Sequence, residues 1–165
     1  MTKPHVGLTY VVEQIRDGVV IDREVVDNIV PTEGLNYLLS CGLDGGSQIT
    51  SWYMGVFENN YTPQYTDTAA LFPGGGYAGE STAYDEAARQ TVSFGTVSSG
   101  VLATDANCAF TMNATKTIYG AFIASASAKS STAGTLVSAV KFSSSKSVQD
   151  NDVLSLSASV TLSGA

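Results

Sequence analysis

The C-terminal segment DVLSLSASVTLSG alternates apolar and small hydroxyl residues at every second position. Its apolar positions are Leu154, Leu156, Ala158, Val160 and Leu162, and its hydroxyl positions are Ser155, Ser157, Ser159, Thr161 and Ser163. Because side chains of a β-strand point alternately to its two faces, this pattern indicates a half-buried strand. A hydroxyl face without charge can meet water, or it can meet another subunit. The segment therefore predicts a sheet that covers a core with one face and carries a neutral outer face.

Further strand-like segments precede this one. Two β-rich runs, at 6–15 and 19–26, are joined by Asp17 and Gly18 and predict a hairpin. The segment SWYMGVFEN predicts a strand buried on both faces. One side carries Trp52, Met54 and Val56, and the other carries Tyr53 and Phe57. Further short strands are predicted in TVSF, ANCAFTMNAT, KTIYGAFIAS and TLVSAVKFS, with Gly, Ser, Asn and Asp between them.

These segments predict an all-β fold, a β-sandwich or jelly-roll of about eight strands with one short helix and a long loop at about 60–90. The chain of 165 residues fits a single domain, 1–165, with enough length to bury a core. We interpret the Ser-rich pieces ASASAKSSTAG and SSSKSVQDND as turns between strands. No domain boundary is predicted.

The helix is predicted in VPTEGLNYLLSCGLDGG. Thr32 is a suitable N-cap, and Gly42 lies where a helix end is expected. Leu35, Leu38 and Leu39 fall on one face at helical spacing. This pattern predicts a helix of about three turns that lies on a sheet.

Charge and cysteine content exclude several classes of function. The formal net charge is -7, the charged fraction is 14%, and the basic residues form no run, so nucleic-acid binding is not predicted. No apolar run approaches the roughly 18 residues of a membrane span, and no signal peptide is recognised, so folding in a cytoplasm is expected. Cys41 and Cys108 are not in a CxxC pair. We predict two buried, reduced thiols, with a disulfide between them as the alternative.

The sequence PGGGYAGEST does not support nucleotide binding. A P-loop needs a lysine that reaches the terminal phosphates, and none is present. Glu80 stands before Ser81, where its carboxylate would oppose a phosphate. We predict instead that the three glycines, Gly74 to Gly76, adopt positive φ in a close-packed surface loop.

The chain offers few groups for catalysis or metal binding. His5 is the one histidine, and beside Pro4 it is predicted to be exposed. Two carboxylate pairs, Asp85 with Glu86 and Asp150 with Asp152, are predicted to be turn and cap residues rather than a glycosidase pair. Arg89 is a predicted partner for Glu86 at i,i+3. The run QDND has oxygen ligands but lacks the spacing of a calcium loop. We predict no catalytic residue, no cofactor and no metal.

Aromatic residues crowd the long loop, which is too apolar for disorder and is predicted to be ordered by contact. Three interpretations remain open: packing onto the chain's own sheet, docking onto another protein, or stacking on sugars. For the docking interpretation, the predicted partner-interface residues are Tyr61, Tyr65, Leu71, Phe72, Tyr77 and Tyr84. The N-terminal hairpin is a second predicted contact region.

Five segments give the chain a resemblance to small structural proteins of tailed bacteriophages: NIVPTEGLNYLL, SWYMGVFEN, STAYDEAARQTVSF, TIYGAFIASAS and SVQDNDVLSLSASVTL. The likeness runs from about Val6 to Leu162, and those of these phage proteins that are encoded among the head genes are similar to capsid decoration, or cement, proteins. The resemblance implies a β-sandwich or jelly-roll on the outer capsid that ties coat subunits together. It also implies homo-oligomers, and it carries over no catalytic or metal residues.

The expected function is therefore that of a structural virion protein made in the host cytoplasm. Its expected partners are the major capsid protein and further copies of itself, as a dimer or trimer, without nucleic acid or membrane. Some chains with this resemblance are tail-fibre or baseplate modules, so a receptor- or glycan-binding module is the alternative. A carboxylate-dependent glycan hydrolase ranks last, because no carboxylate pair has a recognisable context.

Overall fold

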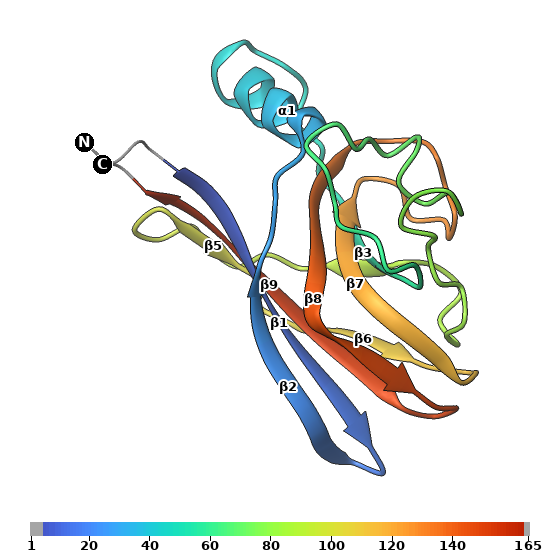
Figure 1. Ribbon diagram of the computed structural model, residues 1–165. Helices are drawn as coiled ribbons and strands as arrows, with labels where there is room; N and C mark the ends of the chain where they lie inside the picture. Colours follow the sequence, from blue (N-terminus) through green and yellow to red (C-terminus); the bar gives the residue numbers. More distant parts are fainter. Residues whose placement is uncertain (1–4, 164–165) are drawn as a thin grey trace.

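The computed structural model describes residues 5–163 of the chain (Figure 1). Within this range the elements follow in the order β1 (His5–Arg16), β2 (Val19–Asp27), α1 (Thr32–Leu43), β3 (Trp52–Phe57), β4 (Gln90–Val92), β5 (Val101–Ala103), β6 (Cys108–Thr111), β7 (Lys116–Ala124), β8 (Leu136–Val148) and β9 (Val153–Ser163). The long loop, residues 58–89, joins β3 to β4.

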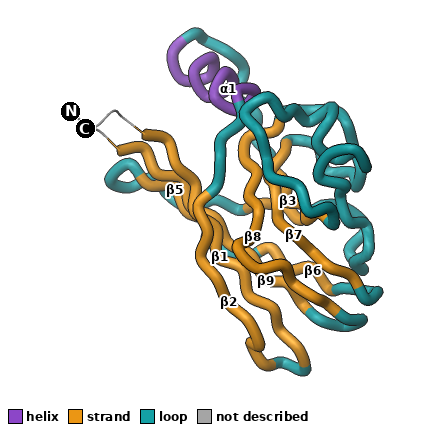
Figure 2. The backbone as a smooth tube through the Cα atoms, in the orientation of Figure 1, coloured by secondary structure: helices purple, strands orange, loops and turns teal. Residues whose placement is uncertain are grey.

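The strands form two antiparallel sheets (Figure 2). The first sheet has the order β2-β1-β9-β5, and β6 also pairs with β9. The second sheet has the order β4-β3-β7-β8. In the first sheet, β1 pairs with β9 along its whole length, from His5 opposite Ser163 to Ile15 opposite Val153. This arrangement confirms the prediction of an all-β fold with one helix.

The inward faces of the two sheets share one apolar cluster, the inter-sheet core. Its strand residues include Leu8, Tyr10 and Val12 of β1, Met54 and Val56 of β3, Ile118, Ala121 and Ile123 of β7, Val140 and Phe142 of β8, and Leu154, Leu156 and Ala158 of β9. The Tyr10 and Ser138 hydroxyls lie 2.6 Å apart and connect the sheets through one buried hydrogen bond. The predicted alternation of β9 is thus confirmed. Its apolar face runs from fully buried Leu154 to Leu162, which is 60% exposed.

The β1–β2 hairpin forms as predicted. Asp17 has φ 51° and Gly18 has φ 76°, which are the left-handed conformations that a type I′ turn requires. Near the turn, Gln14 pairs with Asp22 but Ile15 pairs with Val20, so Ile21 is an extra, bulged residue. β2 is the outermost strand of its sheet, and the hairpin extends beyond the second sheet (Figure 1).

The helix exists, but its predicted ends are wrong, and of its predicted apolar face only Leu35 packs against the core. It begins at Thr32 itself after Pro31, has no side-chain cap, and continues through Gly42 to Leu43. Leu38 and Leu39 are 38% and 60% exposed. Contact with β8 comes instead from Gly34, where an added Cβ would lie 2.8 Å from the Val137 Cα atom. The absence of a side chain at Gly34 is therefore what lets the helix lie on the sheet.

Three further predictions need correction. β8 continues through Ser143, Ser144 and Ser145, which were predicted to form a turn, and β5 was not predicted. Gly74 to Gly76 do not adopt positive φ. The positive-φ glycine of this segment is Gly79, with φ 63°. The two cysteines are free thiols, but only Cys108 is buried, and Cys41 is half-buried. The predicted exposure of His5 lies outside the described side chains.

Candidate partner interface

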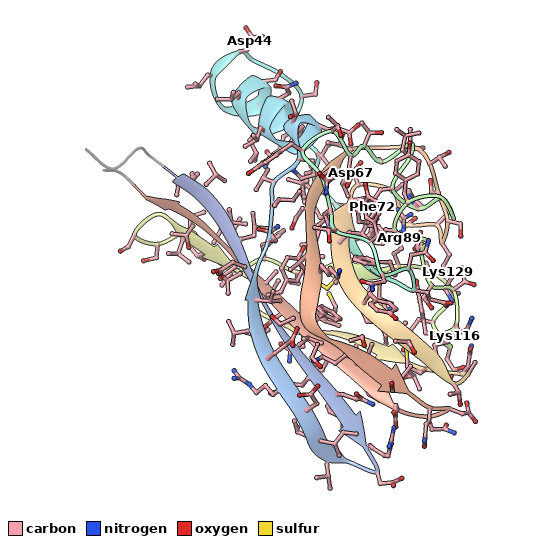
Figure 3. The ribbon with its side chains drawn as sticks, in the orientation of Figure 1. Asp44, Asp67, Phe72, Arg89, Lys116 and Lys129 are labelled. Carbon is pink, nitrogen blue, oxygen red and sulfur yellow. The ribbon has the colours of Figure 1, made fainter. Side chains whose placement is uncertain are left out.

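The long loop packs over the face of the second sheet that lies opposite the inter-sheet core (Figure 3). Loop residues Ala69, Phe72 and Ala78 are all buried there. They form a second apolar cluster, the loop core, with Phe57, Phe122, Ala124, Leu136 and Ala139 of the sheet. Because the loop supplies part of this core, it is ordered by the chain's own packing.

Phe72 is the anchor of the loop core. Its ring is fully buried and meets Phe57 at 5.6 Å and Phe122 at 5.3 Å between ring centroids, both edge-on. Tyr61 contacts the Phe72 ring at 6.1 Å and the Tyr77 ring at the same distance. Edge-to-face pairs of this kind add stabilisation beyond the buried area. The aromatic residues of the loop therefore form one connected set, from the sheet to the surface.

Carboxylates satisfy the backbone groups of this irregular segment. Asp67 is buried and accepts hydrogen bonds from the Tyr61 hydroxyl and the Gln64 amide, each at 2.7 Å. Burial and the hydrogen bond to Asp67 raise the pKa of Tyr61 to about 12, so this phenol stays protonated. Glu33 of α1 accepts from the amides of Ala69 and Leu136, at 2.8 and 2.6 Å, and so joins helix, loop and β8.

A buried ion pair closes the far end of the loop. Arg89 Nη2 lies 2.6 Å from Glu80 Oε2, Arg89 Nε donates to Oε1 at 2.9 Å, and both side chains are 0% exposed. The guanidinium also donates to the carbonyls of Ala126 and Ser131 and lies 5.0 Å above the Phe122 ring. Arg89 was predicted to pair with Glu86. That prediction is wrong because residues 81–89 form no helix. Residues three apart in the sequence are neighbours on a helix, so without one Glu86 and Arg89 are not brought together.

The six predicted interface residues divide into a buried group and a surface group. Phe72 and Tyr84 are 0% and 1% exposed and belong to the interior, and Tyr61 is half-buried. Tyr65, Leu71 and Tyr77 are 64%, 44% and 36% exposed. These three residues, the loop patch, are the part of the set that another molecule can reach.

Tyr84 lies in the second half of the long loop and packs into the inter-sheet core. Its ring lies 5.0 Å from the Phe110 ring, and Lys129 Nζ sits 3.7 Å from the Tyr84 ring centroid. Burial raises the pKa of the Tyr84 phenol far above its ordinary value. The hydroxyl has no hydrogen-bond partner within residues 5–163, which makes it the one unsatisfied buried side-chain atom of that range.

A second exposed region lies on the first sheet, which the sequence indicated only in part. Its outward face carries half-buried Thr9 and Val11 of β1 beside half-buried Ser157 and Ser159 of β9. β2 adds the large exposed side chains of Val20 and Val25 to this face, and Val19 and the bulged Ile21 are exposed near the turn. The alternation within DVLSLSASVTLSG predicted the hydroxyl face, but four exposed β-branched residues in β2 were not foreseen.

The inward side of the same hairpin is charged and anchored. Lys146 of β8 has a fully buried side chain and lies 2.7 Å from Asp22 and 3.1 Å from Glu24 of β2. Glu24 also accepts from the amides of Ser143 and Ser144. These contacts hold β2 against the end of β8, so the hairpin is a fixed projection of the fold.

The predicted turn carboxylates take part in structural contacts. Asp152 is buried and accepts from Arg16 Nε and Nη2 at 2.8 and 2.7 Å, and from Gln14 at 3.0 Å. Arg16 holds the pKa of Asp152 at about 2, below its usual 3.8. Glu86 accepts from the Thr111 amide, and Asp85 and Asp150 are exposed. Across residues 5–163, no three His, Cys, Asp or Glu side chains are grouped so that they could hold a metal ion.

No helix of the described part of the chain is long and apolar enough to cross a membrane. No protein-family model matches the chain, and no curated protein matches its sequence.

Proposed function

We propose that this protein is a structural virion protein of a tailed bacteriophage, a head decoration or cement protein. In this proposal it is made in the host cytoplasm, binds the outer capsid surface and stabilises contacts between major capsid protein subunits. It acts as a homo-oligomer, touches neither nucleic acid nor membrane, and catalyses no reaction. The resemblance in the five segments named above supports the family. The loop patch supports the mode of action.

The observation that carries the proposal is a set of exposed aromatic and apolar side chains on a loop that its own buried core orders. Tyr65, Leu71 and Tyr77 are exposed, while Phe72, beside Leu71 in the chain, is fully buried in the loop core. A loop that is ordered before binding loses little backbone entropy when it docks. Tyr is a frequent anchor residue in protein interfaces. An ordered loop with these exposed residues suits binding to a protein shell.

The surface composition suits the same role. Only 14% of the residues are charged. Desolvating hydroxyl and apolar groups costs less than desolvating charges, so a weakly charged face can be buried in an interface without paired ions. Many symmetric copies on one particle strengthen binding through avidity, so that each contact need only be modest.

For the architecture, we propose the β-sandwich or jelly-roll that the sequence predicts. The β1–β2 and β7–β8 connections each stay within one sheet, whereas the chain passes between the sheets from β2 to β3, β4 to β5, β6 to β7 and β8 to β9. Sandwiches built from Greek keys contain both kinds of connection, so this topology is compatible with either form.

The test uses expanded capsids of the encoding phage, prepared without this protein. Wild-type protein is expected to bind them at a saturating number of copies per capsid. Tyr65→Ala/Leu71→Ala/Tyr77→Ala is expected to lower occupancy at least about tenfold, as the loss of interface anchors does. Val97→Ala, which changes an exposed residue outside the loop, is the matched control. Failure of the wild-type protein to bind, or unchanged occupancy of the triple variant, contradicts the proposal.

Surface substitutions are the sharper test than deletion of residues 68–79. This segment contributes Phe72, Ala69 and Ala78 to the loop core. A deletion would therefore expose Phe57 and Phe122 and damage the fold together with the patch.

One observation favours the alternative, a receptor- or glycan-binding module of a tail fibre or baseplate. The Tyr65 side chain is 64% exposed, and Tyr77 is exposed on the same loop. Exposed tyrosine rings can stack on sugars. A glycan array with Tyr65→Ala and Tyr77→Ala as controls tests this role. Binding of wild type that both variants lose, together with tail localisation by immunogold labelling, would favour the alternative over the capsid.

A further inference from the structure

The outer edge of β2 presents backbone groups that point away from the fold. The Asn28 amide donates to the Leu8 carbonyl at 2.9 Å, in register with the β1–β2 ladder. Residues of an antiparallel pair alternate between those that bond the neighbouring strand and those that point away from it. Even-numbered residues of β2 therefore bond β1, and the amides and carbonyls of Arg23, Val25 and Asp27 point outward. Within residues 5–163, these three amides have no hydrogen-bond acceptor.

This edge has some of the features by which natural sheets avoid pairing and lacks others. Such sheets protect their edges with proline, lysine and other charged side chains, inward-pointing charges, bulges or very short strands. The bulge at Ile21 ends the regular part of β2 on one side, and Asp27 ends it on the other. The six residues from Asp22 to Asp27, DREVVD, contain neither proline nor lysine, but four of them are charged, and Asp22 and Glu24 point inward to Lys146. Val25 at their middle is β-branched and 54% exposed.

We propose that β2 pairs antiparallel with β2 of a second copy of this chain, around a two-fold axis through Val25. In this register Val25 lies opposite Val25 of the second copy, and Arg23 lies opposite its Asp27. The three outward residues of each copy then meet three outward residues of the other. Every outward amide and carbonyl from Arg23 to Asp27 gains a partner.

Charge favours this register over its neighbours. An axis through Val26 places no like charges opposite each other, but it forms no Arg23–Asp27 pair. A two-fold axis through Arg23 places two arginines opposite each other and Asp22 opposite Glu24. An axis through Glu24 places two glutamates opposite each other. Like charges directly across a strand pair are destabilising. The axis through Val25 instead forms two Arg23–Asp27 pairs on the outer face.

The existing contacts of these side chains leave them able to form those pairs. Thr9 Oγ1 donates to Asp27 Oδ1 at 2.9 Å, which leaves Oδ2 for the arginine of the second copy. Arg23 Nε is 3.2 Å from Glu13, in an exposed pair of small energetic value. On the inner face, Glu24 lies opposite Val26 of the second copy, and its carboxylate is already bound by Lys146 and the Ser143 and Ser144 amides.

The inference specifies how copies contact one another in the homo-oligomer of the proposed function, and it rests on the proposed function only for the existence of that oligomer. Pairing would join the first sheets of two copies into one continuous sheet with a weakly charged outer face. The loop patch lies on the other sheet and stays accessible. Dimerisation is measured with the isolated protein and capsid binding with capsids, so the two can fail separately.

The first experiment follows the oligomeric state of the isolated full chain by sedimentation velocity over a range of concentrations. Wild type is expected to reach twice the 17.1 kDa of one chain. Arg23→Asp places aspartate opposite Asp27 in both pairs and is expected to raise the dissociation constant about tenfold. Asp27→Arg is expected to act in the same way. The double variant Arg23→Asp/Asp27→Arg restores opposite charges across the axis and is expected to recover most of the affinity.

The second experiment locates the axis. Val25→Cys is expected to give a disulfide-linked dimer under mild oxidation, because opposed Cα atoms lie about 5.5 Å apart, within disulfide reach. Val97→Cys, at a more exposed position outside β2, is the matched control and should stay largely monomeric. Thermal unfolding of each variant reports whether the monomer fold is kept.

Three results would overturn the proposal. The first is a wild-type protein that stays monomeric at the highest concentrations. The same result is expected if a strand of a different protein, and not a second copy, pairs with this edge. The second is a double charge variant no better than its single parents. The third is a dimer that Val25→Cys does not cross-link.

Discussion

The long loop and the β1–β2 hairpin contrast in how their local geometry relates to their packing. The loop has almost no regular secondary structure, yet it buries Phe72, Asp67 and the Glu80–Arg89 pair. The hairpin is regular and begins from a favoured turn, yet β2 leaves Val19, Val20, Ile21 and Val25 exposed. Regular secondary structure in a segment is thus a poor guide to how well the side chains of that segment are buried. The polar groups of the loop are largely satisfied by the loop and the elements around it, whereas the hairpin leaves an open edge.

The strongest test of this contrast is the ion pair that closes the loop. Arg89→Met is expected to lower the free energy of unfolding by about 4 kcal/mol, because it leaves the Glu80 carboxylate buried without its cation. Arg23→Met removes an exposed pair of the hairpin and is expected to cost less than about 0.5 kcal/mol in dilute protein. Urea denaturation measures both variants. Equal losses would erase the distinction between the two regions.

The next largest effect is expected at the anchor of the loop core. Phe72→Ala should destabilise the protein by about 3 kcal/mol, because it removes a fully buried ring and leaves a cavity between Phe57 and Phe122. Val25→Ala, its control on the hairpin, should change stability by less than about 0.5 kcal/mol. Thermal and chemical unfolding give these values. A Phe72→Ala protein as stable as wild type would show that the loop is not held by its core.

The turn end of the hairpin is expected to respond to acid. Arg16 and Gln14 depress the pKa of Asp152 from 3.8 to about 2. A carboxyl with a depressed folded-state pKa stabilises the fold above its unfolded pKa, and this stability is lost as the pH falls from about 4 towards 2. Asp152→Asn should cost about 2 kcal/mol at pH 7. Denaturation curves from pH 7 to pH 2 should converge for the two proteins, and Asp150→Asn should follow wild type throughout.

The smallest expected effect tests the one place where the loop leaves a polar atom unsatisfied. Tyr84→Phe removes a buried hydroxyl that has no partner within the described residues, and it keeps the ring against Phe110. We expect stability to rise by up to about 1 kcal/mol, because the desolvation of that hydroxyl is no longer required. Differential scanning calorimetry can resolve the change. A clear loss of stability would mean that the hydroxyl is hydrogen-bonded in solution.

Local patterns in the sequence predicted the elements whose conformation is set by residues close together in the chain. The Asp17–Gly18 turn, the two-faced strand β3 and the alternation of β9 follow from backbone preference and side-chain period. The all-β class and the ordered loop followed from the same kind of reasoning.

Contacts between distant residues could not be predicted in this way. The extension of β8 was missed because Lys146 looked like a surface residue of a turn. It is buried because Asp22 and Glu24, more than 100 residues earlier, neutralise it. Arg89 was assigned to Glu86 on local spacing, whereas its partner Glu80 is nine residues away and reaches it through the fold of the loop. Among the six predicted interface residues, composition alone could not separate buried Phe72 from exposed Leu71 next to it.

The pairing of His5 with Ser163 brings the start of β1 beside the end of β9 (Figure 1). Polypeptides joined to the start of β1 and to the end of β9 would therefore leave the fold at the same end of the first sheet, whereas the long loop covers the second sheet. The fold should tolerate circular permutation in which a short linker joins His5 to Ser163 and new ends are opened in an exposed turn. The fold is thus suited to carrying a displayed cargo without obstructing the face proposed to bind the shell.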